Sequence, residues 1–393
     1  MKRETIIVCG SGIVGLAAAL GLARAGFGVA LLGPRRLVPA AARDEYCPRV
    51  YAISPASQQF LEQLGVWPML DDGRVTPVET MEVHGDADGQ VTLHAWQAAQ
   101  PTLAWIVESS ELERALQQAV RVYGIAWHDD TLQGIQGATV STAAGRTHAA
   151  DLLVGADGAA SPVREAAGIH KAGKPYGDVG LVAHLTTEYP HQHTAMQWFN
   201  ADGVLALLPL PDTADGHQVS MVWSMPAALA QSLQDMPQAA RDQALEARLQ
   251  AATGDRLGRL RIRSPLLGFP LFMEHSAMIA PGVALVGDAA HRVHPLAGQG
   301  LNLGLADAQA LARVLAGKEP YRRVGDARLL QRYRRLRAEP LLAMRLATDG
   351  LYKMFALEGA PAVWARNTGM RLVQRLPMVK RRLIASASDW PQY

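Results

Sequence analysis

Cysteine and charge are both scarce in this chain of 393 residues. The two cysteines, Cys9 and Cys47, are too few for a disulfide framework or a cysteine-ligated metal site, and we interpret both as structural thiols in a reducing cytoplasm. Charged residues make up 19% of the chain, and the formal net charge is +2. This balance argues against a nucleic-acid-binding protein and against a disordered tail.

Targeting signals and repeats are absent as well. The first strand pattern begins at Thr5, which leaves no room for a signal peptide. The apolar stretch 6–22 contains glycines and is followed at once by another strand pattern, so it predicts a buried strand–helix unit rather than a membrane span. The sequence has no internal repeat, and it offers no Ser/His/Asp triad or pair of carboxylates for hydrolytic chemistry.

Glycine at the ends of strands is what the chain does contain. Residues 287–304 read GDAAHRVHPLAGQGLNLG and follow the strand pattern of 283–286. A strand, an acidic residue and a glycine-rich turn into a helix bring backbone N–H groups against a polyphosphate and a ring system. Asp288 would accept hydrogen bonds from a sugar-like hydroxyl chain, while Gly298 and Gly300 would let a flat ring approach the backbone. An ordinary tight turn before a core helix is the alternative.

The start of the chain carries a second such turn. Gly10, Gly12 and Gly15 form a G-x-G-x-x-G motif between a strand pattern at 5–9 and an apolar helix pattern. A further strand pattern follows, and this context is typical of a dinucleotide whose pyrophosphate lies at the helix N-terminus. A Rossmann helix without a cofactor is the alternative.

One expected part of this motif is missing. The second strand should end in Asp or Glu to bind the adenosine ribose, but Gly33 stands there, followed by Pro34, Arg35 and Arg36. The arginines could bind a 2′-phosphate, as in a nicotinamide phosphate cofactor, or pack over the adenine, or point into solvent. We favour a dinucleotide that is held more weakly than usual at its ribose.

A third strand-end motif lies at 151–164, where DLLVGADGAASPVR contains Asp157 and Gly158. A nicotinamide dehydrogenase needs fewer such motifs, whereas three of them resemble the class A flavoprotein monooxygenases, which have the para-hydroxybenzoate hydroxylase fold. The resemblance implies that the motif at 10–15 binds the FAD pyrophosphate and that the motif at 151–164 supports FAD and the passing NAD(P)H. The motif at 287–304 would bind the ribityl and pyrophosphate part of FAD.

Further segments narrow the resemblance to the ubiquinone-biosynthesis hydroxylases, which hydroxylate the ring of polyprenylated phenol or quinol precursors. The match covers nearly the whole chain, in order. It rests on RVYAIS at 49–54, SQQFLEQLGVW at 57–67, WIVE at 105–108, LALLPL at 205–210, VWS at 222–224, FPL at 269–271 and residues 369–380. It departs at Gly33 and at Ser110, where the family pattern has an arginine before the following helix.

The order of the patterns predicts an α/β fold with two interleaved domains and C-terminal helices. The Rossmann-like FAD-binding domain would comprise residues 1–75, 101–174 and 270–340. The substrate domain would comprise residues 76–100 and 175–269, and residues 341–393 would be a C-terminal helical segment. Within the substrate domain we expect antiparallel strands at 180–185, 194–198, 204–208 and 219–223 and a helical insertion at 227–249.

The resemblance implies a reaction carried by the cofactor, in which NAD(P)H reduces FAD, O₂ adds to it, and a flavin hydroperoxide transfers oxygen to an electron-rich ring. His291, His294 and Pro295 are the candidate catalytic residues, with the alternative that the histidines only shape the loop. Arg49 would be a cation near the FAD pyrophosphate or ring. The remaining cofactor-binding candidates are Gly10, Gly12, Gly15, Asp157, Gly158, Gly287, Asp288, Gly298, Gln299, Gly300 and Asn302, the last of which would start a helix.

Aromatic residues suggest a substrate pocket. Trp198, Trp223 and Phe269 fall on strand or loop positions that would line an apolar pocket over the flavin, as would Phe199 and Leu271. A plain core position is the alternative for each of them.

The C-terminal segment suggests a membrane surface. From Met370 on, apolar residues at helical spacing are interspersed with arginines and lysines. Such a helix can lie on an anionic bilayer, or it can pack on the FAD-binding domain with its charges in water. Pro377 argues against one long helix.

The sequence therefore predicts an FAD- and NAD(P)H-dependent aromatic-ring monooxygenase of ubiquinone biosynthesis. Its partners would be a prenylated phenol or quinol and O₂, with no nucleic acid, and it would be cytoplasmic and peripheral to the inner membrane or part of a quinone-synthesis complex. Two alternatives stay open: the same fold acting on a soluble aromatic compound, and a non-catalytic subunit of such a complex. A halogenase is disfavoured because the Trp-x-Trp-x-Ile-Pro signature is absent.

Overall fold

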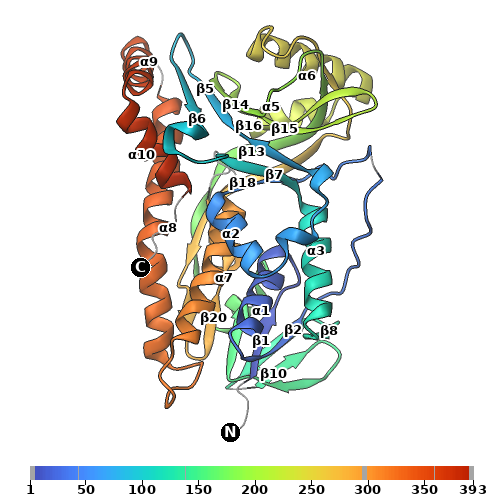
Figure 1. The fold of residues 1–393 in the computed structure, drawn as a ribbon, viewed down its shortest axis with the longest axis vertical. Coiled ribbons are helices and arrows are strands. Elements are labelled where there is room, and N and C mark those ends of the chain that lie inside the picture. The colour runs from blue at the N-terminus through green and yellow to red at the C-terminus, as the bar shows by residue number, and fades with distance from the viewer. Residues whose placement is uncertain (1–4, 43, 138, 294–298, 358, 389–393) are drawn as a thin grey trace.

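The computed structural model describes residues 5–42, 44–137, 139–293, 299–357 and 359–388 (Figure 1). Two sheet-containing lobes lie one above the other in this view, and helices of the C-terminal part run along one flank of both. The α/β class, the second antiparallel sheet and the C-terminal helices that the sequence predicts are all confirmed.

The lower lobe is built on a six-stranded sheet in the order β19-β20-β12-β1-β2-β8, in which every pair except β19–β20 is parallel. Its central strands are apolar and buried along almost their whole length, as is typical of parallel strands covered on both faces. The strands are β1 (Thr5–Cys9), β2 (Gly28–Leu32), β8 (Ala126–His128), β12 (Leu152–Gly155), β19 (Ile279–Ala280) and β20 (Val283–Leu285).

Three helices pack together beside this sheet: α1 (Ile13–Arg24) contacts both α3 (Ser109–Val122) and α7 (Gly300–Ala316). A small antiparallel sheet of β9 (Leu132–Gln136), β10 (Thr139–Thr142) and β11 (Thr147–Ala149) adjoins the short helix α4 (Pro162–Ala166). Short 3-10 turns occupy Trp67–Met69, Asp72–Arg74, Ala95–Ala98 and Gly287–Ala289.

The upper lobe is a nine-stranded sheet, β21-β18-β13-β16-β15-β14-β5-β6, with β17 paired to β13. The four predicted antiparallel strands are present and pair as neighbours. The strands are β5 (Thr80–His84), β6 (Gln90–His94), β13 (Lys171–Thr187), β14 (Thr194–Asn200), β15 (Gly203–Thr213), β16 (Gly216–Pro226), β17 (Leu260–Ile262), β18 (Leu267–Ser276) and β21 (His291–Arg292).

The predicted helical insertion is two helices, α5 (Ala227–Gln234) and α6 (Gln238–Thr253). Pro237 precedes α6 and ends the first helix, because proline cannot continue the hydrogen-bond pattern. Between the lobes lie α2 (Pro55–Gln63) and a third small sheet of β3 (Val50–Ile53), β7 (Ala104–Glu108) and β4 (Val75–Val78).

The C-terminal part forms α8 (Ala327–Ala356), α9 (Ala360–Arg375) and α10 (Pro377–Ser388). Pro377 starts α10, so the predicted break at this proline is confirmed. Figure 1 shows α8 running from the bottom of the lower lobe to the upper lobe, where α9 and α10 lie beside β5 and β6.

Four of the predicted domain boundaries fall inside continuous elements. The boundary at 75/76 lies within β4, that at 174/175 within β13, that at 269/270 within β18, and that at 340/341 within α8. The turn signals in the sequence do not coincide with the points at which the chain leaves a sheet or a helix. Domain boundaries inferred from those signals therefore fall inside continuous elements. The division of the chain into domains stays a prediction.

Candidate functional site

Three glycine-bearing turns meet at one edge of the parallel sheet. β20, β12 and β1 are neighbours, and Gly10, Ala156 and Gly287 follow their carboxyl ends. Backbone bonds join the strand ends, since Ala156 N donates to Cys9 O (2.7 Å) and Val286 N to Gly155 O (2.9 Å). The carboxyl edge of a parallel sheet is where such folds bind ligands.

Two glycines of the first turn are required by the packing of the turn itself. Gly10 has φ +117°, and a Cβ atom there would lie 2.1 Å from Ala156 O. A Cβ atom on Gly15 would lie 2.1 Å from Gly10 O. Gly12 differs, because a Cβ atom there would meet no atom within 4 Å. The chain therefore closes around Gly10 and Gly15 and leaves space at Gly12, where α1 begins.

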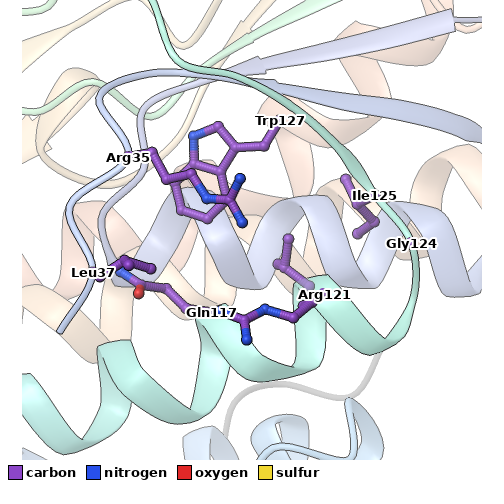
Figure 2. A pocket seen from close by; sticks show the side chains of 8 residues that line it. Arg35, Leu37, Gln117, Arg121, Gly124, Ile125 and Trp127 are labelled. Carbon is purple, nitrogen blue, oxygen red and sulfur yellow. The ribbon is translucent and has the colours of Figure 1, made fainter. Parts of the chain in front are cut away.

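The space at Gly12 opens into a cavity of about 220 Å³ lined by Ser11, Gly12, Pro34, Arg36, Glu113 and Gln117. A second cavity of about 220 Å³ shares Gln117 and extends along α3 to Trp127. Figure 2 shows Gln117 and Arg121 on one helix facing Arg35 and Trp127 across this second cavity. The Arg35 guanidinium lies 5.7 Å from the centre of the Trp127 ring. The cavity at Gly12 thus adjoins an arginine- and aromatic-lined groove.

The turn at Gly287 is held from behind by one buried carboxylate. Asp307 of α7 accepts hydrogen bonds from Gly287 N (2.9 Å) and His291 Nε2 (2.6 Å) at Oδ2, and from Arg337 Nε (2.6 Å) at Oδ1. Asp307 is fully buried, and His291 and Arg337 are nearly so. Burial alone would raise the pKa of the Asp307 carboxyl, but the neighbouring His291 and Arg337 outweigh it and hold that pKa below its ordinary value.

Two further side chains fix the same loop. Arg164 Nη1 donates to Ala289 O (3.0 Å), and the Tyr333 hydroxyl donates to Leu285 O (2.8 Å). Both side chains are buried. Asp307, Arg337 and Tyr333 were not among the predicted site residues. A signal for Asp307 is present in the sequence, since it is the single acidic residue in the mostly apolar helix pattern of 300–316 and needs a partner when buried there.

The large antiparallel sheet has two different faces. One is covered by α5 and α6, and its core includes Trp198 and Trp223 with Leu205, Leu233 and Leu245. The predicted placement of Trp198 and Trp223 in a substrate pocket is therefore wrong. Successive residues of a strand point to opposite faces, and the sequence alone does not say which face lies toward the ligand.

The other face is turned toward the lower lobe. His184 Nε2 lies 2.8 Å from Cys47 O. The Phe199 ring stacks on the ring of Phe355 of α8, and the two ring centres are 3.8 Å apart. The strand register places Val182 and Val222 on this face, and both are only half-buried. Phe269 pairs with Gly180 on the same face and is exposed. This inward face combines half-buried apolar residues with the buried polar residues His184, Gln197, Ser220 and Ser224, and it contains Phe199 and Phe269 of the predicted set.

Comparison with known proteins identifies the family. A model described as an FAD binding domain matches residues 3–345. The chain is 34% identical over 400 residues to 3-demethoxyubiquinol 3-hydroxylase of Escherichia coli (strain K12), with 97% of both chains covered. It is 32% identical to ubiquinone hydroxylase UbiL of Rhodospirillum rubrum, covering 98% of this chain and 90% of the relative. The chain belongs to the FAD-dependent ubiquinone-biosynthesis hydroxylases.

Solved structures agree on the fold. Over 98% of this chain, the hydroxylase resembles p-nitrophenol 4-monooxygenase PnpA from Pseudomonas putida DLL-E4, with a TM-score of 0.77, 20% identity and 99% of that chain covered. It resembles flavin-dependent brominase Bmp2 with a TM-score of 0.76, 14% identity and 93% of that chain covered. These likenesses show the fold alone, and they confirm the predicted para-hydroxybenzoate hydroxylase-type architecture.

FAD is the cofactor of this family, and the site suits it. The open space at Gly12 adjoins the N-terminus of α1, whose first N–H groups can receive a pyrophosphate. Gly287 and Gly304 come so close to Val14 of α1 that Cβ atoms there would lie 3.3 and 2.7 Å from its side chain. The Gly287 turn and the start of α7 therefore pack against the first turn of α1, as the FAD interpretation requires.

The missing acidic residue at the ribose has a steric explanation. A Cβ atom on Gly33 would lie 3.2 Å from both Ser11 N and Ser11 Oγ, tighter than ordinary contact. The loop is pinned in this position, because Trp127 Nε1 donates to Gly33 O (2.9 Å) and Ser11 Oγ to Pro34 O (2.8 Å). A side chain at this strand end would have to displace Ser11 by a few tenths of an ångström, which favours glycine here.

Other predicted cofactor residues have bonds within the protein. The carboxylate of Asp157 accepts from Ser161 Oγ and from Val163 N (2.9 Å), so it caps α4. Gly158 has φ +84° beside it. Asn302 bonds to Ser54 N (3.0 Å) and Ala52 O (2.8 Å). It lies within the first turn of α7, which starts at Gly300 after Gln299, so the prediction that Asn302 starts the helix is wrong.

The charged candidates lie around Tyr51. The Arg49 guanidinium is 5.1 Å from the Tyr51 ring centre. Burial raises the pKa of Tyr51 to about 12, with Arg49 lowering it and Asp288 raising it further. Burial also raises the pKa of Glu113, which Arg49 opposes. Arg49 and the exposed Asp288 thus lie near the cavity that Glu113 lines.

The predicted His294, Pro295 and Gly298 lie outside the described residues, so their roles stay predictions. Within the described part of the chain, no helix is long and apolar enough to cross a bilayer.

Proposed function

We propose that this chain is an NAD(P)H-using monooxygenase that hydroxylates the ring of a polyprenylated phenol or quinol intermediate of ubiquinone biosynthesis. The observation that carries the proposal is the end-to-end match to a 3-demethoxyubiquinol 3-hydroxylase, with 97% of both chains covered. The inward sheet face supports it, because half-buried apolar residues such as Val182 and Val222 beside a few polar groups suit an apolar ring and tail.

FAD, when bound, supplies the redox chemistry, and the protein supplies binding, orientation and a dry pocket. The N-terminus of α1 at Gly12 would hold the pyrophosphate of FAD, and the exposed Asp288 would accept hydrogen bonds from its ribityl hydroxyls. The Gly287 turn keeps its shape because Asp307, Arg164 and Tyr333 hold it. Val182, Val222 and Phe269 exclude water from the ring of the substrate.

His291 is a positioning residue in this proposal. Its Nε2 atom is bonded to a buried carboxylate and its side chain is buried, so it is placed to hold the loop rather than to exchange protons with a substrate. The alternative in the sequence analysis, that this histidine shapes the loop, is the one that we retain.

Turnover of defined substrates tests the proposed function. The FAD-loaded protein is given NADH or NADPH and either a prenylated phenol or a small water-soluble phenol, and hydroxylated product is measured by mass spectrometry with NAD(P)H consumption. We expect product from the prenylated phenol. Product from the soluble phenol alone would favour the soluble-aromatic alternative, and a protein that binds no FAD would favour the non-catalytic subunit.

The substrate face gives a separate prediction. Val222→Trp fills the inward face, so we expect the KM for the prenylated substrate to rise about tenfold or more while FAD affinity is unchanged. Trp223→Ala, one residue along, empties the core under α5 and should cost about 3–5 kcal/mol of unfolding free energy without a specific effect on KM. Steady-state kinetics and urea unfolding check both. The reverse pattern would place the substrate on the α5–α6 face.

The second cavity is proposed to receive the adenosine end of FAD, with the Trp127 ring replacing the absent ribose carboxylate as the main contact. Stacking of a base on an aromatic ring contributes about 1–3 kcal/mol. Trp127→Ala is therefore expected to weaken FAD binding at least about fivefold in a fluorescence titration. Trp127→Phe, which keeps a ring but loses the bond to Gly33 O, is the matched control and should retain most of the affinity. Equal losses in both variants would assign the effect to the loop instead.

The protein must also bind its proposed substrate at the location where that substrate is found. An isoprenoid tail partitions into a bilayer, so the hydroxylase is proposed to work at the surface of the inner membrane from the cytoplasmic side.

A further inference from the structure

The last two helices dock on the protein through polar residues. Arg366 of α9 pairs with Asp86, and Asn367 Nδ2 donates to Asp86 Oδ1 (2.8 Å). Asn367 Oδ1 accepts from Gly89 N (2.8 Å), and Lys380 of α10 donates to a backbone oxygen of β6 (3.0 Å). Arg366, Asn367 and Lys380 are all buried. The faces of α9 and α10 that touch the β5–β6 hairpin are therefore strongly polar.

Several large apolar residues of these helices are on the outside. Met378 is 85% exposed and Trp364 is 67% exposed. The other exposed apolar residues of the pair are Leu372, Leu376, Val379 and Leu383. A surface helix of a globular protein normally turns its apolar stripe to the core and its polar face to water. Here Ile384 is buried, but six large apolar residues between 364 and 383 are exposed, which is more than scattered single residues account for.

Charge on the same helices has one sign. Residues 360–388 contain no Asp or Glu and six basic residues: Arg366, Arg371, Arg375, Lys380, Arg381 and Arg382. Arg375, Arg381 and Arg382 are exposed. Arg371 pairs with the exposed Asp88 at 3.1 Å and donates to Thr368 Oγ1 at 3.2 Å. The outward surface of α9 and α10 is thus apolar and cationic together.

We propose that this surface binds an anionic lipid bilayer, with α9 and α10 lying in the plane of the headgroups. The inference rests on the proposed function, because it specifies where a prenylated substrate is met. Apolar side chains flanked by exposed arginines match acyl chains and anionic headgroups, and each basic residue near such a surface contributes about 1 kcal/mol. A second copy of the chain would present the same cations and repel them, so charge favours the lipid. The β5–β6 hairpin holds the two helices rigidly against the substrate sheet.

Co-sedimentation with vesicles tests the inference on the full-length, FAD-loaded protein without substrate. We expect binding to vesicles of phosphatidylcholine mixed with phosphatidylglycerol, much weaker binding to phosphatidylcholine alone, and loss of binding at high salt. Leu372→Glu with Met378→Glu should reduce binding about tenfold or more. Val122→Glu, at a 69% exposed position on α3, is the matched control and should bind as the parent does.

Two further measurements make the outcome decisive. FAD affinity and the urea midpoint of the double variant are expected to equal those of the parent, because both residues project away from the protein. Arg381→Glu with Arg382→Glu should abolish the preference for anionic vesicles. The inference would be overturned if the parent and the Leu372→Glu, Met378→Glu variant bound vesicles equally. It would also be overturned if neither protein bound vesicles and the parent formed a dimer that dissociated in this variant. Vesicle binding without turnover of a prenylated phenol would instead refute the proposed function alone.

Discussion

Gly10→Ala is expected to destabilise the protein by about 3 kcal/mol or more, whereas Gly12→Ala leaves the free energy of unfolding unchanged and weakens FAD binding. The first cost has two sources. The added Cβ atom would lie 2.1 Å from Ala156 O, and φ is +117°, where residues with side chains are strained. At Gly12 a Cβ atom meets nothing within 4 Å, and φ is −80°. Its methyl group would instead occupy the space that we propose for the pyrophosphate.

Urea unfolding of the FAD-free proteins and fluorescence titration with FAD separate the two effects. In the absence of FAD, Gly12→Ala should unfold at the same urea concentration as the parent. With FAD present it should be stabilised less than the parent, because FAD stabilises the folded protein by mass action. Gly26→Ala is a useful control, because its φ is +92° but a Cβ atom there has no close neighbour, so it reports strain without the clash. A Gly10→Ala protein no less stable than Gly26→Ala would mean that the turn does not close on Ala156.

Asp307→Asn is expected to cost about 3–5 kcal/mol, because it leaves the buried Arg337 guanidinium without its partner. The amide also no longer holds Gly287 N and His291 as a carboxylate does, so FAD binding should weaken as the loop loosens. Urea unfolding at neutral pH and an FAD titration measure both effects. Arg337→Met in the Asp307→Asn background should recover part of the stability, since the unpaired charge is then gone.

The pH dependence of this variant has a definite sign. The pKa of Asp307 in the folded protein lies below its ordinary value of 3.8, so the ionised carboxylate stabilises the fold fully above that value. The contribution is lost as the pH falls below it toward the folded pKa. The difference in stability between parent and Asp307→Asn should therefore be constant at neutral pH and shrink only in strong acid. Glu319→Gln, at an exposed pair with Arg332, is the control and should change little.

Local patterns predicted the local parts of the site. Gly10, Gly15 and Gly287 were predicted because backbone geometry alone demands glycine at these turns, and the structure shows the close contacts responsible. The strand positions at 194–198 and 219–223 were also predicted, because alternation along a strand is visible in one sequence.

The predictions that were wrong or missing concern contacts between segments that are far apart in the sequence. Trp198 and Trp223 are on the wrong face because alternation defines two faces without saying which one α5 and α6 cover. The Asp307–Arg337 pair joins two helices, and nothing near either residue names its partner. The reason for glycine at position 33 is not visible in the local sequence, because the atoms that would crowd a side chain there belong to Ser11 of another turn.

The helix α8 carries Arg337 in its first half and Phe355 in its last turn, roughly 27 Å further along its axis. Arg337 is bonded to the carboxylate that holds the Gly287 turn, and Phe355 stacks on Phe199 of the large sheet. Both lobes are thus fastened to a single helix, which contains Pro340 close to Arg337. We expect that a shift of the large sheet that displaces Phe199 is passed along this helix toward the point where the Gly287 turn is anchored.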